Sequence, residues 1–127
     1  MEWPPEAERV LERGKWGTVE YAVRANGDME AKEWYEAQDQ SIRQSFGVLF
    51  KRLLSEGRIT NETQCRQLRD TIWEFKRRGD RLLFGLVGNR RLLTHHYAKG
   101  GQKCPKREID RAESIIEEHI QQEALRQ

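Results

Sequence analysis

The feature that most constrains the fold is a succession of three short strand-like runs in the second half of the chain. Residues 71–76, 81–87 and 90–97 are rich in β-branched, aromatic and aliphatic side chains, as strands are. The four residues 77–80 and the pair Gly88-Asn89 separate the runs, and short Gly- and Asn-containing links of this kind form tight turns. The sequence therefore predicts an antiparallel β-meander here.

The residues before the meander predict one more strand and two helices. Residues 18–23 alternate as a strand does, whereas residues 29–55 carry apolar side chains at three- and four-residue steps, the period of a helix. Asp28 is placed to cap the first helix, and Asp39 or Ser41 separates it from the second. Two antiparallel helices forming a hairpin is the simplest interpretation.

The segments on either side of these elements are more polar. Residues 4–13 are interpreted as a helical extension, and residues 58–69 as a connector that follows a helix-terminating Gly57. Pro105 opens a last helix. Its expected apolar side consists of Ile109, Ala112, Ile115, Ile116 and Ile120.

Together these elements predict an α+β domain. The order is β-α-α-β-β-β-α, with a helical hairpin and a C-terminal helix packed on a mostly antiparallel sheet. A length of 127 residues favours one domain. We assign residues 17–127 to that domain and residues 1–16 to an N-terminal extension.

The charged residues are distributed unevenly along the chain. The formal net charge is +2, but residues 66–107 hold 12 Lys and Arg against three carboxylates, Asp70, Glu74 and Asp80. The flanking segments 1–65 and 108–127 are both net acidic. A basic segment of this kind predicts a surface that binds a polyanion, with internal pairing to the acidic helices as the alternative.

Cysteine content and hydropathy indicate the compartment. Cys65 and Cys104 lack metal-type spacing, and two free thiols in a reducing compartment are expected. No run of eighteen apolar residues predicts a membrane span. Residues 1–6 have neither the basic start nor the apolar stretch of a secretory signal, so we expect a cytoplasmic protein without membrane partners.

The meander and the start of the last helix carry the motifs of a known family. The motifs are Ile-Trp-Glu-Phe-Lys at 72–76, Arg-Leu-Leu-Phe at 81–84, Leu-Leu-Thr-His-His-Tyr-Ala-Lys at 92–99 and Lys-Cys-Pro at 103–105. In their order and spacing they resemble the RelE/ParE toxin superfamily, and within it the HigB-like, phage-derived branch. The resemblance covers residues 18–120 in element order.

The chain departs from the family pattern at several positions. Lys76 stands where Arg is common, His96 replaces a Gly, Gly100 replaces the second lysine of a Lys-Lys pair, and Cys104 replaces the Thr that would cap the last helix. The first sixteen residues are unmatched.

The resemblance implies the toxin of a type II toxin–antitoxin module. Such toxins cut messenger RNA, often on the ribosome, and a small antitoxin silences them; in the HigB-like branch it is usually a helix-turn-helix protein. ParE relatives instead inhibit DNA gyrase. The leading hypothesis is an endoribonuclease that needs no metal or cofactor, and the alternatives are a gyrase inhibitor or a non-enzymatic nucleic-acid-binding or regulatory protein.

Metal-free RNA cleavage requires a base for the 2′-hydroxyl, a cation for the charge on phosphorus and an acid for the departing 5′-oxygen. Regular alternation would place five residues on one face of the third strand, namely Arg91, Leu93, His95, Tyr97 and Lys99. Combined with the two neighbouring strands, this face predicts a catalytic site formed by Lys76, Arg81, His95, Tyr97 and Lys99.

Each candidate has a hypothetical role. Arg81 would clamp the scissile phosphate, although a structural pair with Glu74 is its rival. His95 has the ordinary pKa of a general base or acid. Lys76 or Lys99 would activate the 2′-hydroxyl, and Tyr97 would stack on a nucleotide unless it packs in the core.

Five further cations would hold backbone phosphates, namely Arg66, Arg69, Arg77, Arg78 and Lys103. Arg90 and Arg91, beside a turn, are interpreted as solvated. The aromatic residues at helical spacing are interpreted as core rather than as a stacking platform; they are Trp34, Tyr35, Phe46 and Phe50.

Overall fold

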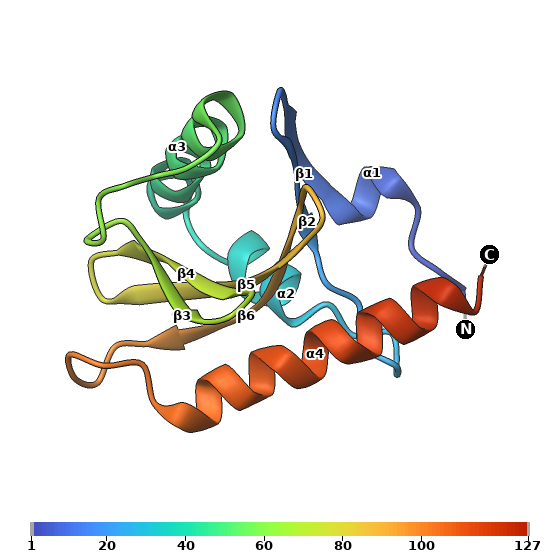
Figure 1. Ribbon diagram of the computed structural model, residues 1–127. Helices are drawn as coiled ribbons and strands as arrows, with labels where there is room; N and C mark the ends of the chain where they lie inside the picture. The colour runs from blue at the N-terminus through green and yellow to red at the C-terminus, as the bar shows by residue number, and fades with distance from the viewer. Residues whose placement is uncertain (1, 127) are drawn as a thin grey trace.

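The computed structural model describes residues 2–126, which fold around one six-stranded sheet (Figure 1). The strands are β1 (Val10–Gly14), β2 (Gly17–Tyr21), β3 (Cys65–Arg69), β4 (Ile72–Arg77), β5 (Asp80–Val87) and β6 (Arg90–Ala98). Their order across the sheet is β1-β2-β6-β5-β4-β3. β2 runs parallel to β6, and all other neighbours are antiparallel. The α+β class and the mostly antiparallel sheet are confirmed.

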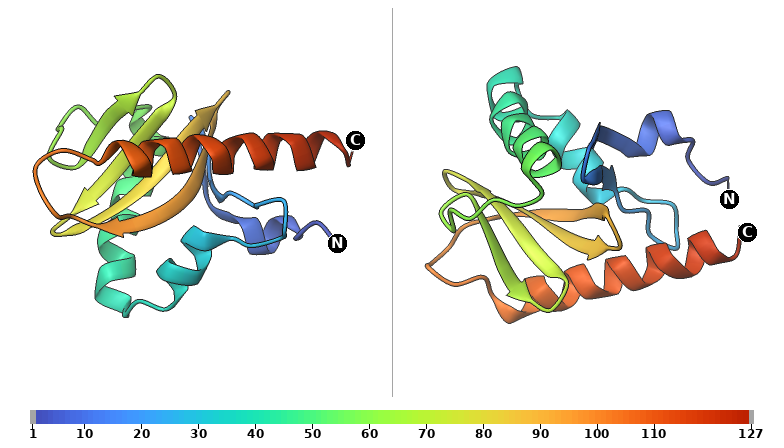
Figure 2. Two further views of the ribbon diagram at one scale, coloured as in Figure 1. Left: turned by 90° about the horizontal axis from the view of Figure 1, so that it is seen from below. Right: turned by 45° about the horizontal axis from the view of Figure 1, so that its top comes forward.

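The helices cover both faces of the sheet. They are α1 (Glu6–Arg9), α2 (Glu30–Glu36), α3 (Gln40–Glu56) and α4 (Lys106–Ala124). α3 stands on one side of the sheet and α4 crosses the other, as the view from below in Figure 2 shows. α2 packs against β6, and α3 packs against β1 and β4. We call the two sides the α3 face and the α4 face.

Aromatic side chains fill the core of the α3 face. Phe50 and Phe75 meet edge to face with ring centroids 5.0 Å apart, and Phe75 stacks on Phe84 at 4.5 Å. Burying a side chain of this size stabilises the fold by about 1.5–3 kcal/mol. Phe46 and Phe50 are buried and Trp34 and Tyr35 pack against them, so their interpretation as core residues is confirmed.

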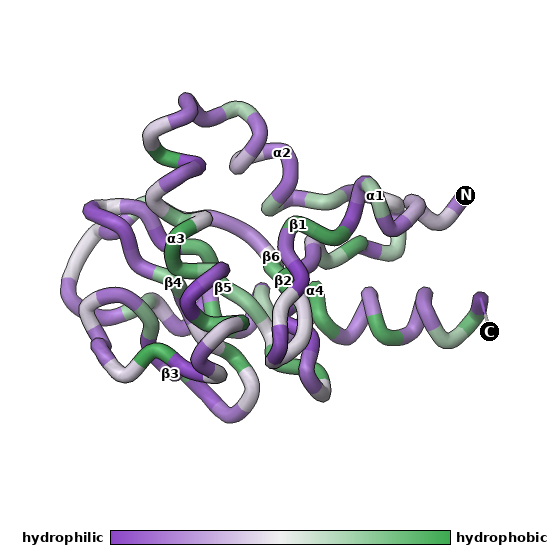
Figure 3. The backbone as a smooth tube through the Cα atoms, turned by 90° about the horizontal axis from the view of Figure 1, so that it is seen from above, coloured by the Kyte–Doolittle hydropathy of each residue, from purple (hydrophilic) through white to green (hydrophobic). Residues whose placement is uncertain are grey.

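The α4 face is held by one apolar stripe of the helix. Figure 3 shows apolar and polar residues alternating along α4, and the buried positions are Ala112, Ile115, Ile116 and His119. Since this stripe passes through His119, Ile120 lies beside it and is 44% exposed. The prediction that Ile120 belongs to the apolar side was therefore wrong.

Both edge strands are absent from the predicted element order. Residues 4–13 are helical only over Glu6–Arg9, and the residues that follow form β1; residues 65–69, expected as connector, form β3. Each edge strand has an irregular register against its neighbour, between Val10 and Glu12 and between Gln67 and Arg69. An irregular register disturbs the two-residue alternation by which a strand is recognised in a sequence. The division at residue 16 remains a prediction about the extent of the family domain.

The helix boundaries follow local chemistry. Asp39 Oδ1 accepts a hydrogen bond from the Ile42 amide at 3.0 Å and caps α3, and Gly57 ends that helix with a left-handed φ of 89°. Both boundary predictions are confirmed. The predicted cap by Asp28 was wrong, because the N-cap of α2 is Met29 and no side chain bonds to it there.

Both cysteines are free thiols, as predicted. Within residues 2–126, no helix is long and apolar enough to cross a membrane.

Candidate functional site

A bulge at Thr94 decides which side chains share a face. Leu83 pairs with His95 and Phe84 pairs with Leu93, so Thr94 is an extra residue in β6. As a result Leu93 packs in the core of the α3 face, whereas His95 and Tyr97 point to the α4 face. The expectation that all five residues from Arg91 to Lys99 share one face was therefore wrong for Arg91 and Leu93.

The structure does bring four of the predicted catalytic residues together on the α4 face. Lys76 of β4 pairs with Arg81 of β5, which pairs in turn with Tyr97 of β6. His95 lies two residues before Tyr97 on the same strand. The fifth residue, Lys99, comes after the end of β6, where its amide donates to the carbonyl of Gly79 at 2.8 Å.

Arg81 is buried without an acidic partner. It is 6% exposed, and its Nη1 donates to the carbonyls of Arg78 at 2.7 Å and Asp80 at 3.0 Å. The rival interpretation, a pair with Glu74, is not seen; Glu74 instead accepts a hydrogen bond from the Tyr97 hydroxyl at 3.1 Å. Carbonyl groups solvate the guanidinium but leave its charge uncompensated, a costly arrangement inside a protein.

His95 is closed off from solvent. It is 2% exposed, with Nε2 3.0 Å from Glu108 Oε1 and Nδ1 3.1 Å from Thr94 Oγ1. Burial lowers the pKa of His95, and the hydrogen bond to Glu108 opposes that shift only in part. The first turn of α4 covers this ring, so His95 does not face solvent at the predicted site.

Tyr97 is half-buried beside the same helix start. It packs with Cys104 and Ile109, and burial is the main cause that raises the pKa of its phenol. The hydroxyl is therefore a neutral hydrogen-bond donor at physiological pH, and its donation to Glu74 holds it in place. The ring packs in the core, which was the alternative to stacking on a nucleotide, while its hydroxyl lies in the row with Arg81.

Exposed cations surround the end of the sheet where Arg81 lies. Arg78, Lys99 and Lys103 are exposed, and within residues 2–126 their side chains have no carboxylate partner. The bond from Lys99 to Gly79 ties the loop after β6 to the β4–β5 turn. We call Arg78, Lys99 and Lys103 the basic rim; Lys76 lies beside it, with Nζ 3.1 Å from the carbonyl of Glu62.

The other predicted phosphate contacts lie elsewhere. Arg69 is paired with Asp110 at 2.8 Å and Glu113 at 2.7 Å on α4, which is the internal pairing considered as the alternative. Arg77 lies on the α3 face and donates to the carbonyl of Ser45 at 2.9 Å. Arg66 pairs in register with Glu74, whose side chain lies on the α4 face, and also borders a pocket beside β3. Of the five predicted contacts, Arg78 and Lys103 belong to the basic rim.

The family model described as phage-derived protein Gp49-like (DUF891) matches residues 33–117, about two thirds of the chain. The chain belongs to this Gp49-like family. The matched range begins within α2, ends within α4 and contains all ten predicted site residues. No curated protein matches the chain significantly. The phage-derived part of the resemblance is thus confirmed.

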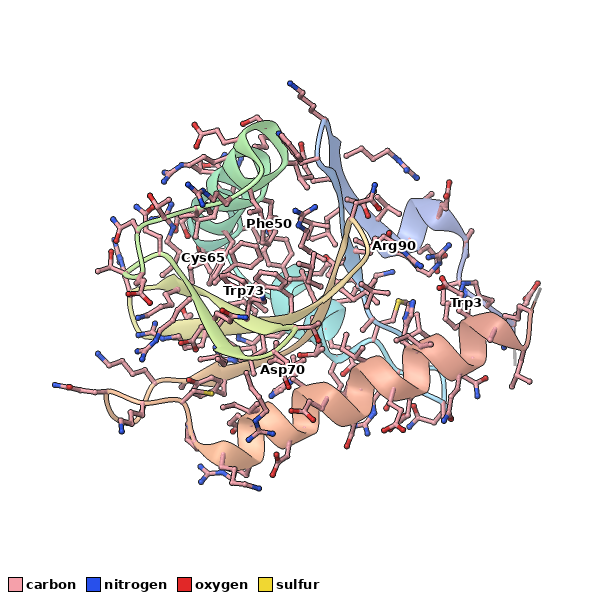
Figure 4. The ribbon with its side chains drawn as sticks, in the orientation of Figure 1. Trp3, Phe50, Cys65, Asp70, Trp73 and Arg90 are labelled. Atoms are coloured by element: carbon pink, nitrogen blue, oxygen red, sulfur yellow. The ribbon has the colours of Figure 1, made fainter. Side chains whose placement is uncertain are left out.

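The Gp49-like protein also has a buried ion-pair cluster that the sequence did not indicate. Arg90, labelled in Figure 4, bonds through Nε to Glu20 Oε2 at 3.0 Å and through Nη1 to Glu123 Oε1 at 2.7 Å. Arg9 adds a second cation 3.4 Å from Glu20. Arg90 and Arg91 had been interpreted as solvated, and this was wrong for both, since Arg91 is 7% exposed.

The candidate site of the Gp49-like protein is cationic. Among the described residues, no three His, Cys, Asp or Glu side chains are grouped to hold a metal ion. The groups available near Arg81 are the amines of the basic rim, the amine of Lys76, the phenol of Tyr97 and the buried carboxylate of Glu74, which accepts the hydrogen bond of that phenol. Such a set can bind a phosphodiester and stabilise negative charge on it.

Proposed function

We propose that this Gp49-like protein is the toxin of a type II toxin–antitoxin pair and cuts messenger RNA, on the ribosome, at the basic rim. One observation carries the proposal. The guanidinium of Arg81 is buried, forms no ion pair with a carboxylate among the described residues, and lies directly beside the exposed cations of the basic rim. A phosphate group would supply the missing negative charge. Arginine is suited to this because its planar fork can donate two parallel hydrogen bonds to phosphate oxygens.

The proposed reaction uses the 2′-hydroxyl of the RNA itself. Its oxygen attacks phosphorus while its proton passes to a water molecule, the bond to the 5′-oxygen breaks, and that oxygen gains a proton; a 2′,3′-cyclic phosphate and a 5′-hydroxyl result. Arg81 stabilises the charge on the phosphorus oxygens, and Lys76 or Lys99 stabilises the attacking oxygen. Tyr97 is the proposed donor to the departing oxygen.

His95 takes a different part in this proposal from the one expected. Because it is buried against Glu108, we assign it as a positioning residue that holds the first turn of α4 over the sheet.

The proposed partner is an antitoxin of the helix-turn-helix type. It rests on the likeness to HigB-like toxins and on membership of a phage-derived family. Pull-down with the product of the neighbouring gene tests it directly: a stable complex that stops growth arrest supports the assignment, and growth arrest unaffected by that product contradicts it.

The decisive experiment compares two charge reversals in cells. Lys99→Glu with Lys103→Glu alters the basic rim, and Lys15→Glu with Lys51→Glu makes the same charge change at two exposed lysines elsewhere. We expect the wild type and the control to arrest growth and to cut translated messages, and the rim variant to cut at least about tenfold less. Sequencing of RNA 5′ ends measures cleavage.

Arg81→Lys tests the buried cation separately. It keeps the charge but loses the fork of donors, so cleavage should be abolished while circular dichroism shows a folded chain. Growth arrest with intact RNA and broken chromosomes would indicate a gyrase inhibitor instead. Cleavage that continues in both the Arg81→Lys and rim variants would refute the proposed site, and loss of cutting when translation is blocked would support action on the ribosome.

A further inference from the structure

A pocket on the α3 face contains a second buried cation that lacks an anion. The pocket has a volume of about 380 Å³ and lies between the end of α3, the segment after it, β3 and the sheet. Figure 4 labels two residues of its wall, Cys65 and Trp73, on the side of the sheet that faces α3. It lies on the opposite face of the sheet from Arg81 and contains none of the proposed catalytic residues.

Arg91 supplies the unpaired charge. It is 7% exposed, and its Nη1 donates to the carbonyl oxygens of Asn89, at 2.8 Å, and Trp16. No carboxylate in the described part of the chain forms an ion pair with Arg91, and its Nε and Nη2 donate no hydrogen bond to the protein. Burial lowers the pKa of Arg91, which reflects the same cost of enclosing an uncompensated charge.

The environment of Arg91 resembles that of Arg81 and differs from that of the buried ion pair Arg9–Glu20. Arg9 and Glu20 are also buried, and they pair with each other and with Arg90. Arg91 instead faces a cavity. One further cation, Arg58, lines the same pocket without a carboxylate partner among residues 2–126.

The wall also contains Thr60, Glu62 and Gln67, and its apolar part is flat on one side. The rings of Trp73 and Phe84 lie nearly parallel, at 15° with centroids 6.4 Å apart, and Leu86 follows Phe84 on the same face of β5. Pockets of about 300–1,000 Å³ with apolar walls and a few converging polar groups are typical of small-molecule sites. This one would enclose a ligand with one or two rings.

We propose that this pocket binds a small organic anion, with its acidic head on the guanidinium of Arg91 and a planar apolar body against Trp73, Phe84 and Leu86. The head is a carboxylate or a phosphate, because both match the donor fork of arginine. The site is independent of RNA cleavage, and its test uses no RNA.

The test is a nuclear magnetic resonance titration of the full chain with matched probes. 2-Naphthoate and 2-naphthyl phosphate carry the two acidic heads, and 2-naphthamide is the neutral counterpart. We expect saturable shifts of the Trp73 indole and Arg91 Nε signals with at least one anion, and binding at least about tenfold weaker for the amide. The anion that binds with the higher affinity identifies the preferred head group. The affinity for inorganic phosphate measures how much the charge contributes without an apolar body.

Three variants protect the test against a folding artefact. Arg91→Gln should remove the preference for the anion. Leu86→Trp should fill the pocket and abolish binding while residue 91 stays an arginine, although the two residues are cross-strand neighbours. Val48→Trp places the same ring on the outside of α3, where Val48 is 53% exposed, and should bind as the wild type does. Equal affinity for naphthoate and naphthamide, shifts centred elsewhere, or wild-type binding by Leu86→Trp would each overturn the proposal.

Discussion

Gly85 shows how one missing side chain sets the position of a helix. A Cβ built at this residue would lie 2.5 Å from Cγ1 of Ile116, so α4 approaches the sheet as closely as it does only because residue 85 is glycine. The contact is between β5 and the buried stripe of α4. The glycine at this position is therefore a packing requirement.

Gly85→Ala should destabilise the protein by about 1–3 kcal/mol, because the new methyl group overpacks the α4 face. Urea unfolding followed by circular dichroism measures the change. Ile116→Ala, which alone leaves a cavity, should recover part of the loss when it is combined with Gly85→Ala. Gly79→Ala is the control, since a Cβ there meets nothing within 4 Å; equal effects of the two alanines would contradict the explanation.

His119 makes stability depend on pH in a definite direction. It is fully buried, and its Nδ1 accepts a hydrogen bond from the Val23 amide at 2.9 Å. Among residues 2–126 its Nε2 has no hydrogen-bond partner, and Glu123 Oε2 lies 3.6 Å from it. Burial is the main cause that lowers the pKa of His119, and the pKa of His95 is lowered for the same reason. Both rings are therefore neutral in the folded state when an unfolded histidine already binds a proton.

The free energy of unfolding should fall as the pH drops from about 6.5 towards 5, since the unfolded chain then binds more protons than the folded one. The slope reaches at most about 1.4 kcal/mol per pH unit for each histidine. Carboxylates with a lowered pKa, such as Glu118, change the free energy of unfolding below about pH 4.5, outside this window. Urea titrations at pH 7.5, 6.5 and 5.5 should give a flatter profile for His119→Phe; an unchanged slope would rule out this account.

At the scale of elements, the ion pairs of Arg90 join three parts of the chain. Arg90 starts β6, Glu20 belongs to β2, and Glu123 lies in the last turns of α4. The side chain of Glu20 is only 5% exposed, so its charge depends on these partners. The Arg90 and Arg9 cations, together with hydrogen bonds, lower the pKa of Glu20 although burial, the largest cause, opposes the shift.

Arg90→Met should cost about 2–4 kcal/mol, because it leaves Glu20 buried with one cation fewer. Thermal unfolding at neutral pH measures the loss, and Arg90→Met with Glu20→Gln should be less destabilised than the single variant. Arg13→Met removes an exposed pair with Glu6, whose side chains are 58% and 70% exposed, and should change little. A comparable loss in Arg13→Met would show that charge removal in general, and not this cluster, is responsible.

The predicted elements were those with a clear period. The helices α3 and α4 and the strands of the meander were expected from their spacing and from boundary residues such as Asp39 and Gly57. β1 and β3 were not, since edge strands with an irregular register have no clean alternation. The bulge at Thr94 could not be predicted either, because nothing at that position distinguishes it from a regular strand residue. The bulge nevertheless determines on which face of the sheet His95 lies.

At the scale of the molecule, the cations of the basic segment 66–107 lie in several separate environments. Arg69 and Arg90 pair with acidic side chains of other elements, Arg81 and Arg91 are buried without one, and the basic rim remains exposed. Composition predicted a cationic surface but could not assign residues to these groups, because that assignment depends on where α4 and β2 bring their carboxylates. The pocket that Arg91 lines could likewise not be predicted from the sequence.

Salt dependence should reveal how many rim cations contact RNA. If Arg78, Lys99 and Lys103 each neutralise one phosphate of a single strand, the logarithm of the binding constant should fall with the logarithm of salt concentration at a slope of about −2. Lys99→Ala should make that slope shallower by about 0.7. Fluorescence anisotropy with the Arg81→Lys background measures both; a slope unchanged by Lys99→Ala would remove that residue from the interface.

The parallel pairing of β2 with β6 joins residues 17–21 to residues 90–98, far apart in the sequence. During synthesis the β1–β2 hairpin therefore leaves the ribosome long before β6 has been synthesised. Until then the edge of β2 that pairs with β6 stays unpaired. Closing so distant a contact is slow, because loop entropy is lost before the pairing is gained. The growing polypeptide thus stays immature until its C-terminal third has left the ribosome.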